Sequence, residues 1–317
     1  MNSDPDPPEQ QADIAGIDLS GRTVLITGST NGIGRAAALA LGRLGATVLV
    51  HGRDREAGET AVSEIEAAGG NARFFRADFA DPEAVSALAD AVDDAVDSLD
   101  ALCNNAGGLF RDREPTSLGV DRAFHVNHLA GYQLTAGLLD TMAPGGRVVT
   151  TASIAHRLGA LDLDRLLDLS GLSPVRAYCR SKLANIQFAR ELAARLQRAD
   201  RDITSNAFHP GIIPGSGFGR TLPGPVSELF GLFGQTPVAE TAADGAATLG
   251  YLAVSPAVAD TTGAYFARCH EIRPAAPARD RNVTRALWEQ SADVLGMAEP
   301  LARRGRRPQG DRTGKPS

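Results

Sequence analysis

The strongest constraint on the fold of this chain is a repeated alternation between short apolar runs and stretches with helical spacing. Arg22–Thr27 is rich in β-branched residues and ends at a glycine, which is typical of a buried strand. Similar runs lie at 47–50, 73–77, 99–103, 146–151, 203–208 and 264–266. Such regular alternation predicts an α/β fold, a doubly wound parallel sheet of about seven strands with helices on both faces.

The segments between these runs delimit one domain. We expect helices over 34–45, 54–68, 117–142 and 175–197, and a single domain over 19–298. Residues 1–18 are rich in Pro, Asp and Gln, and residues 299–317 are basic and rich in Gly and Pro, so we expect both ends to be disordered. The apolar, aperiodic segment 212–237 is expected to form a lid over a substrate site.

Composition excludes several classes of function. The chain has 317 residues, a formal net charge of −6 and a pI of about 5.6, which argues against general binding of nucleic acid. Its three cysteines are too widely spaced for a metal site or a disulfide framework. No apolar run approaches the roughly 20 residues that span a bilayer, and the N-terminus lacks a signal-peptide pattern. We therefore expect a cytoplasmic protein without an integral membrane segment.

Glycines follow the first predicted strand at a spacing that suits a dinucleotide. Gly28 would turn the chain sharply, Gly32 would admit a pyrophosphate, and Gly34 would let the next helix pack on the strand. The free N–H groups at that helix start favour an anion. This strand–turn–helix unit predicts a Rossmann-type nucleotide-binding fold. The residues expected around the phosphates are Gly28, Ser29, Thr30, Asn31, Gly32 and Ile33.

The end of the second predicted strand indicates which dinucleotide binds. An acidic residue there would hold the ribose hydroxyls of NAD and repel a phosphate. We expect Gly52 to take that place, with Arg53 beside it to grip the 2′-phosphate of NADP. Asp54 is expected to cap the following helix.

A series of motifs in fixed order resembles the short-chain dehydrogenase/reductase family, and within it the retinol dehydrogenase-like and protochlorophyllide reductase-like branch. The resemblance covers about Leu19 to Met297. The motifs are Thr27-Gly28-xxx-Gly32-Ile33-Gly34, Asn104-Asn105-Ala106-Gly107, Asn127-His128, Ala152-Ser153-x-Ala155-His156, Tyr178-xxx-Lys182 with Leu183-Ala184-Asn185, and His209-Pro210-Gly211.

This resemblance implies a catalytic group of Asn127, Ser153, Tyr178 and Lys182. Tyr178 would act as general acid or base, and its four-residue spacing places Lys182 on the same helix face. We expect the ammonium of Lys182 to lower the tyrosine pKa. Ser153 would bind the substrate carbonyl. Asn127 would keep a water in line for a proton relay.

The resemblance also implies further contacts with the cofactor, NADP(H). Asp78 would hold the adenine amino group, while Asn104 has either a structural or a ribose-side role. The other implied cofactor contacts are Asn105, Ala106, Gly107, Tyr178, Lys182, Pro210, Gly211 and Ile212.

The apolar lid predicts an apolar carbonyl or alcohol substrate, with Phe218 beside Ser153 and Tyr178. His156 would either line this pocket or serve a structural hydrogen bond. Alternatives to an NADP(H)-dependent oxidoreductase are an NAD-preferring alcohol dehydrogenase and a protein that senses NADP(H) without turnover. Family members often form dimers, so a homodimer is also expected.

Overall fold

The structure is a computed structural model that describes residues 6–111, 114–211 and 241–302. In these ranges the strands are β1 (Thr23–Ile26), β2 (Thr47–Gly52), β3 (Asn71–Arg76), β4 (Leu99–Asn104), β5 (Met142–Thr151), β6 (Ile203–Phe208), β7 (Tyr265–Ala267) and β8 (His270–Glu271). The helices are α1 (Pro8–Gln11), α2 (Gly32–Arg43), α3 (Arg55–Ala67), α4 (Pro82–Asp93), α5 (Arg122–Phe124), α6 (Ala130–Leu138), α7 (Pro174–Arg198), α10 (Ala242–Val254) and α11 (Arg281–Leu295).

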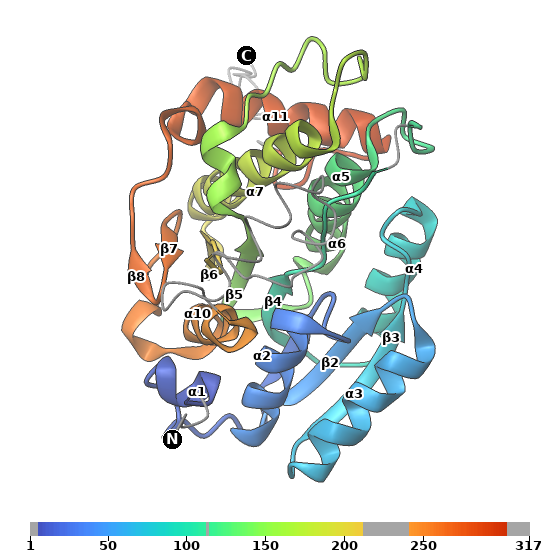
Figure 1. Ribbon diagram of the computed structural model, residues 1–317. Helices are drawn as coiled ribbons and strands as arrows, with labels where there is room; N and C mark the ends of the chain where they lie inside the picture. Colours follow the sequence, from blue (N-terminus) through green and yellow to red (C-terminus); the bar gives the residue numbers. More distant parts are fainter. Residues whose placement is uncertain (1–5, 112–113, 212–240, 303–317) are drawn as a thin grey trace, which may run out of the picture.

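The strands form one sheet in the order β3-β2-β1-β4-β5-β6-β7-β8, so the chain crosses over between β3 and β4 (Figure 1). Pairing is parallel from β3 to β7. β8 is the exception and pairs antiparallel with β7. The predicted doubly wound sheet is confirmed, with β8 as an added eighth strand. Its two residues, His270 and Glu271, are polar and exposed, so no apolar pattern in the sequence predicts this strand.

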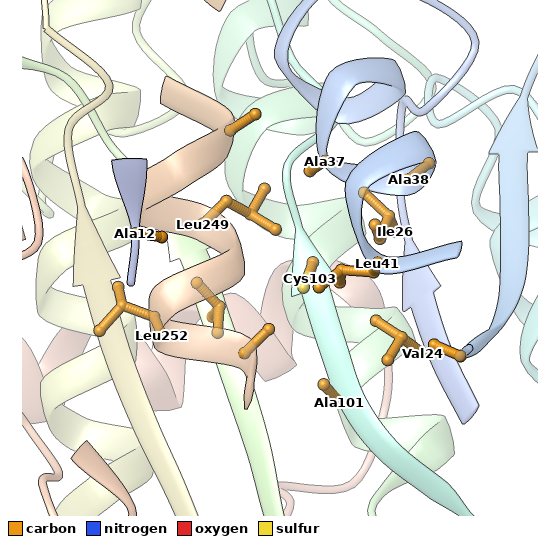
Figure 2. Packing of buried hydrophobic residues seen from close by; sticks show 14 of the residues in the cluster. Ala12, Val24, Ile26, Ala37, Ala38, Leu41, Ala101, Cys103, Leu249 and Leu252 are labelled. Atoms are coloured by element: carbon orange, nitrogen blue, oxygen red, sulfur yellow. The ribbon is translucent and has the colours of Figure 1, made fainter. Parts of the chain in front are cut away.

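Alternate residues of the central strands enter two separate cores. Val24, Ile26 and Val48 face a core shared with α2, α3 and α10, which Figure 2 shows at close range. Leu25 and Leu49 face the opposite core, shared with α4, α6, α7 and α11. Since both faces are covered by helices (Figure 1), the strands read as continuous apolar runs rather than alternating ones.

The expectation of a disordered start is wrong for residues 6–18. Ala12 and Ile14 are 3% and 1% exposed and belong to the core formed with α2 and α10 (Figure 2 labels Ala12). Glu9 also pairs with Arg43 of α2 at 2.7 Å. The segment is polar in composition, but these two apolar residues pack it against the core.

The helix expected over 117–142 is instead three pieces. α5 leads into a π-helical turn over His125–Leu129, and α6 follows it. β5 then begins at Met142, earlier than expected. A π turn inserts one residue into the helical repeat and is frequent at functional sites. Asn127 lies in this turn, which accounts for a residue of poor helix propensity at that place.

The C-terminal end is partly ordered. α11 packs on α7, where the rings of Trp288 and Phe188 stack with centroids 5.7 Å apart. Glu299 pairs with Arg195 of α7, so the expected disorder from 299 onward is wrong for residues 299–302. The expected lid, 212–237, lies outside the described residues. Within the described ranges, no helix has both the length and the apolar character to cross a bilayer.

Candidate active site

The glycine turn lies between β1 and α2 and is closely packed. Gly28 and Gly32 adopt φ values of 65° and 55°, which favour glycine. A Cβ atom on Gly34 would lie 2.4 Å from the Gly28 carbonyl oxygen, and one on Gly28 would lie 2.9 Å from Ala106 Cα. The turn therefore tolerates no larger residue at Gly28 or Gly34, as the sequence predicts for a backbone that approaches a pyrophosphate.

The chain after β4 is fastened to this turn by hydrogen bonds. Thr27 Oγ1 accepts from the N–H groups of Asn105 and Ala106, both at 2.9 Å. Asn105 Nδ2 donates to the Thr27 carbonyl at 2.9 Å. Asn104 instead donates to Thr135 Oγ1 of α6 at 2.8 Å, which favours the structural reading of that residue. The turns after β1 and β4 thus form one rigid edge.

His51, at the end of β2, is a residue that the sequence analysis missed. Its Nδ1 accepts from the Gly28 N–H at 3.2 Å, and its ring stacks on Phe79 at 4.4 Å. Ser29 Oγ accepts from the His51 N–H at 3.0 Å. Burial lowers the pKa of His51 to about 4, so at neutral pH the ring is uncharged and Nδ1 can accept. The sequence signal was a histidine at the end of an otherwise apolar strand.

The end of β2 has a glycine, Gly52, where an acidic residue would stand in an NAD site, and the side chain of Thr30 lies against it. A Cβ atom on Gly52 would lie 2.5 Å from Thr30 Cγ2, so a side chain there would displace Thr30. Arg53 is exposed at this edge, and Arg76 Nε donates to the Arg53 carbonyl at 3.0 Å. Arg76 is a second cation that the sequence analysis did not single out.

The two aspartates near this edge have local hydrogen bonds. Asp54 caps α3 through the Ala57 N–H at 3.2 Å, as expected. Asp78, after β3, accepts from the Ala80 N–H at 3.0 Å and is exposed. Its carboxylate is therefore held at the same edge of the sheet as Gly28 and Arg53.

Tyr178, Lys182 and Ser153 are brought together by β5 and α7. The Tyr178 hydroxyl hydrogen-bonds Ser153, which follows β5. Lys182 is 4% exposed; its Nζ donates to the Thr151 carbonyl at 3.1 Å and lies 5.7 Å from the centre of the Tyr178 ring. The four-residue spacing on one helix thus has the geometry that the sequence predicts.

The pKa values of this pair differ from the sequence expectation. Burial raises the pKa of Tyr178 above its ordinary value, and the hydrogen bond with Ser153 acts in the opposite direction. Burial also lowers the pKa of Lys182 to about 8. The pKa of Tyr178 therefore shifts upward instead of downward, because desolvation outweighs the hydrogen bond with Ser153. At neutral pH the Tyr178 hydroxyl is protonated and is a proton donor.

Asn127 is clamped between the loop after β4 and α7. Its Oδ1 accepts from the Gly108 N–H at 2.8 Å, and its Nδ2 donates to the Gly108 carbonyl at 3.0 Å and to Ser181 Oγ at 2.9 Å. A Cβ atom on Gly107 would lie 2.7 Å from Asn127 Oδ1 and 3.4 Å from Lys182 Nζ. Gly107 therefore lies against both Asn127 and Lys182. The sequence analysis missed Ser181.

His156 has a structural position rather than one in the pocket. Its side chain is fully buried, its Nδ1 donates to the Ser153 carbonyl at 2.7 Å, and its Nε2 accepts from the Ala275 N–H at 3.1 Å. Both ring nitrogens are thus engaged with backbone. The assignment of His156 to the substrate is corrected: it fixes the chain at Ser153 to the segment before α11.

The chain leaves β6 through Pro210 and Gly211, which lie beside the glycine turn. Gly211 has a φ of 89°, and its N–H donates to His209 Nδ1 at 3.1 Å. A Cβ atom on Gly245 would lie 2.8 Å from Pro210 Cβ and 3.1 Å from a side-chain carbon of Ile33. Ile212 and Phe218 lie outside the described residues. In the described ranges, no cluster of three or more His, Cys, Asp or Glu side chains could hold a metal ion.

Comparison with known proteins agrees with this geometry. The family model for short chain dehydrogenases matches residues 22–221. The chain is 40% identical over 283 residues to the "Putative daunorubicin C-13 ketoreductase DnrU" of Streptomyces sp. (strain C5), covering 88% of this chain and 94% of the relative. It is 35% identical to retinol dehydrogenase 13 of Homo sapiens, covering 90% and 88%.

A solved structure supports the same assignment. The angucycline C-6 ketoreductase LanV with bound NADP superposes with a TM-score of 0.66 at 29% identity, covering 80% of this chain and 95% of that one. The sequence interpretation of an oxidoreductase related to retinol dehydrogenases is confirmed, and the chain belongs to the short-chain dehydrogenase/reductase family.

Proposed function

We propose that the protein is an NADP(H)-dependent reductase of a carbonyl group on an apolar small molecule, with Tyr178 as the general acid. The observation that carries this proposal is the Tyr178 hydroxyl, which is hydrogen-bonded to Ser153 and stands on the helix face of Lys182. NADPH would supply the hydride, and the protein's own groups bind, orient and deliver the proton.

The glycine turn fits the cofactor. Gly32 has no Cβ atom and nothing within 4 Å of the place where one would stand, so a phosphate could approach the backbone N–H groups at the start of α2. The 28–33 segment would hold the pyrophosphate and Asp78 the adenine. Asn105, Ala106 and Gly107 would let the backbone approach the cofactor, and Lys182 would hold the nicotinamide ribose. Pro210, Gly211 and Ile212 would form the wall on the nicotinamide side.

The preference for NADP(H) over NAD(H) depends on the edge at β2. Gly52 provides no carboxylate to repel a phosphate, and Arg53 stands exposed beside it. Arg76, bonded to the Arg53 carbonyl, adds a second positive charge. Two guanidiniums suit a dianionic 2′-phosphate, whereas the hydroxyl of NAD would gain little from them.

Proton delivery follows from the geometry around Tyr178. Ser153 would hydrogen-bond the carbonyl oxygen while Tyr178 donates its proton to it. Because burial raises the pKa of Tyr178, the residue begins in the protonated form that reduction requires. Lys182 and Asn127 both lie against Gly107, where Asn127 would keep a water in line for a relay through Lys182 that returns a proton to Tyr178 after each turnover.

The substrate proposed is apolar, and its evidence lies next to the catalytic residues. The large hydrophobic side chains that are most exposed in the described chain are Leu158, Leu167 and Val175. All three fall in the stretch between Ser153 and Tyr178, which would wall the entrance to the site. The predicted lid with Phe218 would complete that wall. The names of the relatives, a daunorubicin ketoreductase and retinol dehydrogenases, fit a large apolar molecule.

Titration with NADPH and NADH tests the proposal, following nicotinamide fluorescence in the wild type, Arg53→Ala and Tyr178→Phe. The matched control is Arg55→Ala, whose exposed side chain pairs with Glu59 within α3. We expect tight NADPH binding in the wild type, Arg55→Ala and Tyr178→Phe, and weaker binding in Arg53→Ala. Equal or tighter binding of NADH would favour the NAD-preferring alternative. If neither nucleotide binds, the proposal that the protein is an NADP(H)-dependent enzyme is wrong. A ketone screen with the loaded protein separates an enzyme from an NADP(H) sensor.

A further inference from the structure

Three arginines line a cleft next to β7 and β8, apart from the residues proposed for catalysis; Figure 1 shows these two strands at one end of the sheet. Arg190 of α7, together with Arg273 and Arg279 from the segment after β8, lines an open cleft of about 430 Å³. The other lining residues are Ala264, Tyr265, Glu271, Ile272 and Pro274. The cleft therefore combines three guanidiniums, one carboxylate and an apolar surface.

These arginines lack the partners that other arginines of the protein have. Ten arginines elsewhere take part in ion pairs, for example Arg22 with Asp100 and Arg180 with Asp121. In the part of the chain that the structure describes, no carboxylate comes within ion-pairing distance of Arg190, Arg273 or Arg279. Glu271 in the lining offsets only part of the charge of the three arginines, so the cleft keeps an excess of positive charge.

Local hydrogen bonds do not satisfy the cluster either. Arg190 Nη1 donates to the Gly263 carbonyl at 2.9 Å, which fixes that guanidinium at one corner of the cleft. Arg279 Nε is buried and has no hydrogen-bond partner among the described residues. Burial, and after it the charges of Arg281 and Arg279, lower the pKa of Arg190, so the positive groups are close enough to repel one another. A buried donor without a partner costs free energy unless a ligand accepts from it.

We propose that this cleft binds a small anionic ligand, held through its phosphate or carboxylate group by Arg190, Arg273 and Arg279. Guanidiniums bind both groups with paired hydrogen bonds. The volume and the apolar lining leave room for a short apolar body attached to the anion. The bound anion would relieve the repulsion within the cluster.

The position of the cleft connects it with the active site. Ala275 lies between Arg273 and Arg279, and its N–H donates to His156, which in turn donates to the Ser153 carbonyl. A ligand that fixes the 273–279 segment therefore steadies the anchor of Ser153. An anion bound in the cleft would therefore influence the position of Ser153.

Phenyl phosphate and benzoate are suitable probes, because they carry the two anionic groups on the same apolar body. Binding is followed by amide hydrogen exchange and by thermal unfolding, neither of which needs cofactor or activity. The test variant is Arg273→Gln/Arg279→Gln; Arg273→Gln alone, at an exposed side chain, is a second variant in case the double one folds poorly. The matched control is Arg285→Gln, an exposed arginine of α11.

We expect at least one probe to slow exchange in 272–279 and to raise the melting temperature by a few degrees at concentrations about a hundred times its Kd. The effect should persist in Arg285→Gln and disappear in the double variant, and the probe that acts identifies the anionic group. Unchanged exchange in 272–279 with both probes would overturn the proposal. So would equal protection in the double variant, or protection confined to the 28–34 loop.

Discussion

The turn after β1 and the turn after β5 hold the two halves of the proposed site, and they are built differently. The first is made of backbone, with glycines so tightly packed that an added Cβ at Gly34 would lie 2.4 Å from an oxygen. The second depends on side chains, in which His156 bonds the Ser153 carbonyl and Tyr178 bonds the Ser153 side chain. A site for a common cofactor thus needs glycines at fixed spacing, whereas the catalytic half needs a network of polar side chains.

The largest effect that separates the two halves is expected from His156→Gln. Losing the bond from Nδ1 to the Ser153 carbonyl should shift Ser153 relative to Tyr178 and lower kcat by up to about 10²-fold. NADPH affinity should stay unchanged, because the glycine turn is untouched. Steady-state kinetics with a ketone check this, with His270→Gln on exposed β8 as the control. A loss of NADPH affinity with kcat intact would show that His156 serves the cofactor half.

Gly34→Ala makes the reciprocal change in the cofactor half. Its Cβ would meet the Gly28 carbonyl, and overpacking of this kind costs about 1–3 kcal/mol. We expect NADPH affinity to fall by about tenfold or more, while kcat at saturating NADPH stays within a factor of two or so, since 1.4 kcal/mol corresponds to tenfold. If fluorescence titration shows an unchanged affinity for NADPH, the turn has space for the added methyl group, contrary to the structure.

Lys182 offers a test by pH. Its folded pKa of about 8 is below the ordinary value of 10.5, so between these values the unfolded chain binds the proton more readily than the folded protein does. Its contribution to the free energy of unfolding therefore rises with pH across this window, by up to about 1.4 kcal/mol per pH unit, and its cost is fully present below pH 8.

Lys182→Met should accordingly raise the free energy of unfolding at pH 7 and flatten the rise between pH 8 and 10.5. Urea unfolding at several pH values measures both. If Lys182→Met is less stable than the wild type at pH 7, the buried charge of Lys182 does not destabilise the folded protein and the prediction is wrong.

The smallest expected effect is that of His51→Ala. It removes one hydrogen bond to the Gly28 N–H, which is worth about 1 kcal/mol, so NADPH affinity should fall about fivefold. His51→Asn, which retains an acceptor, should recover part of the loss. If Asn binds NADPH no better than Ala, the ring acts by stacking on Phe79 rather than through Nδ1.

Much of the fold and the motif-bearing residues could be predicted from the sequence. The central strands β1, β2 and β4 are mostly buried apolar runs, and Gly28, Gly34, Tyr178 and Lys182 are tied to fixed spacings. The π turn at Asn127 was missed because one extra residue in a helix leaves almost no trace in apolar periodicity. The order of residues 6–18 was missed because Ala12 and Ile14 are only two residues in a polar segment.

The polar network was harder to predict, because its bonds join residues far apart in the chain. His156 meets Ala275, 119 positions away, and Asn127 meets Ser181, 54 positions away. No local pattern encodes such pairs. The direction of the Tyr178 pKa shift was wrong for a related reason: the expectation counted the neighbouring charge of Lys182 and left out the burial of both groups.

Single-turnover reduction of a ketone found by screening, followed by the decay of NADPH absorbance, tests the central claim most directly. Wild type and Tyr178→Phe are compared, with Tyr251→Phe of α10 as the matched control. The account predicts that Tyr178→Phe binds NADPH normally but reduces the ketone about 10²- to 10⁴-fold more slowly, the range for loss of a general acid. Reduction by Tyr178→Phe at the wild-type rate would contradict it, because another group would then deliver the proton.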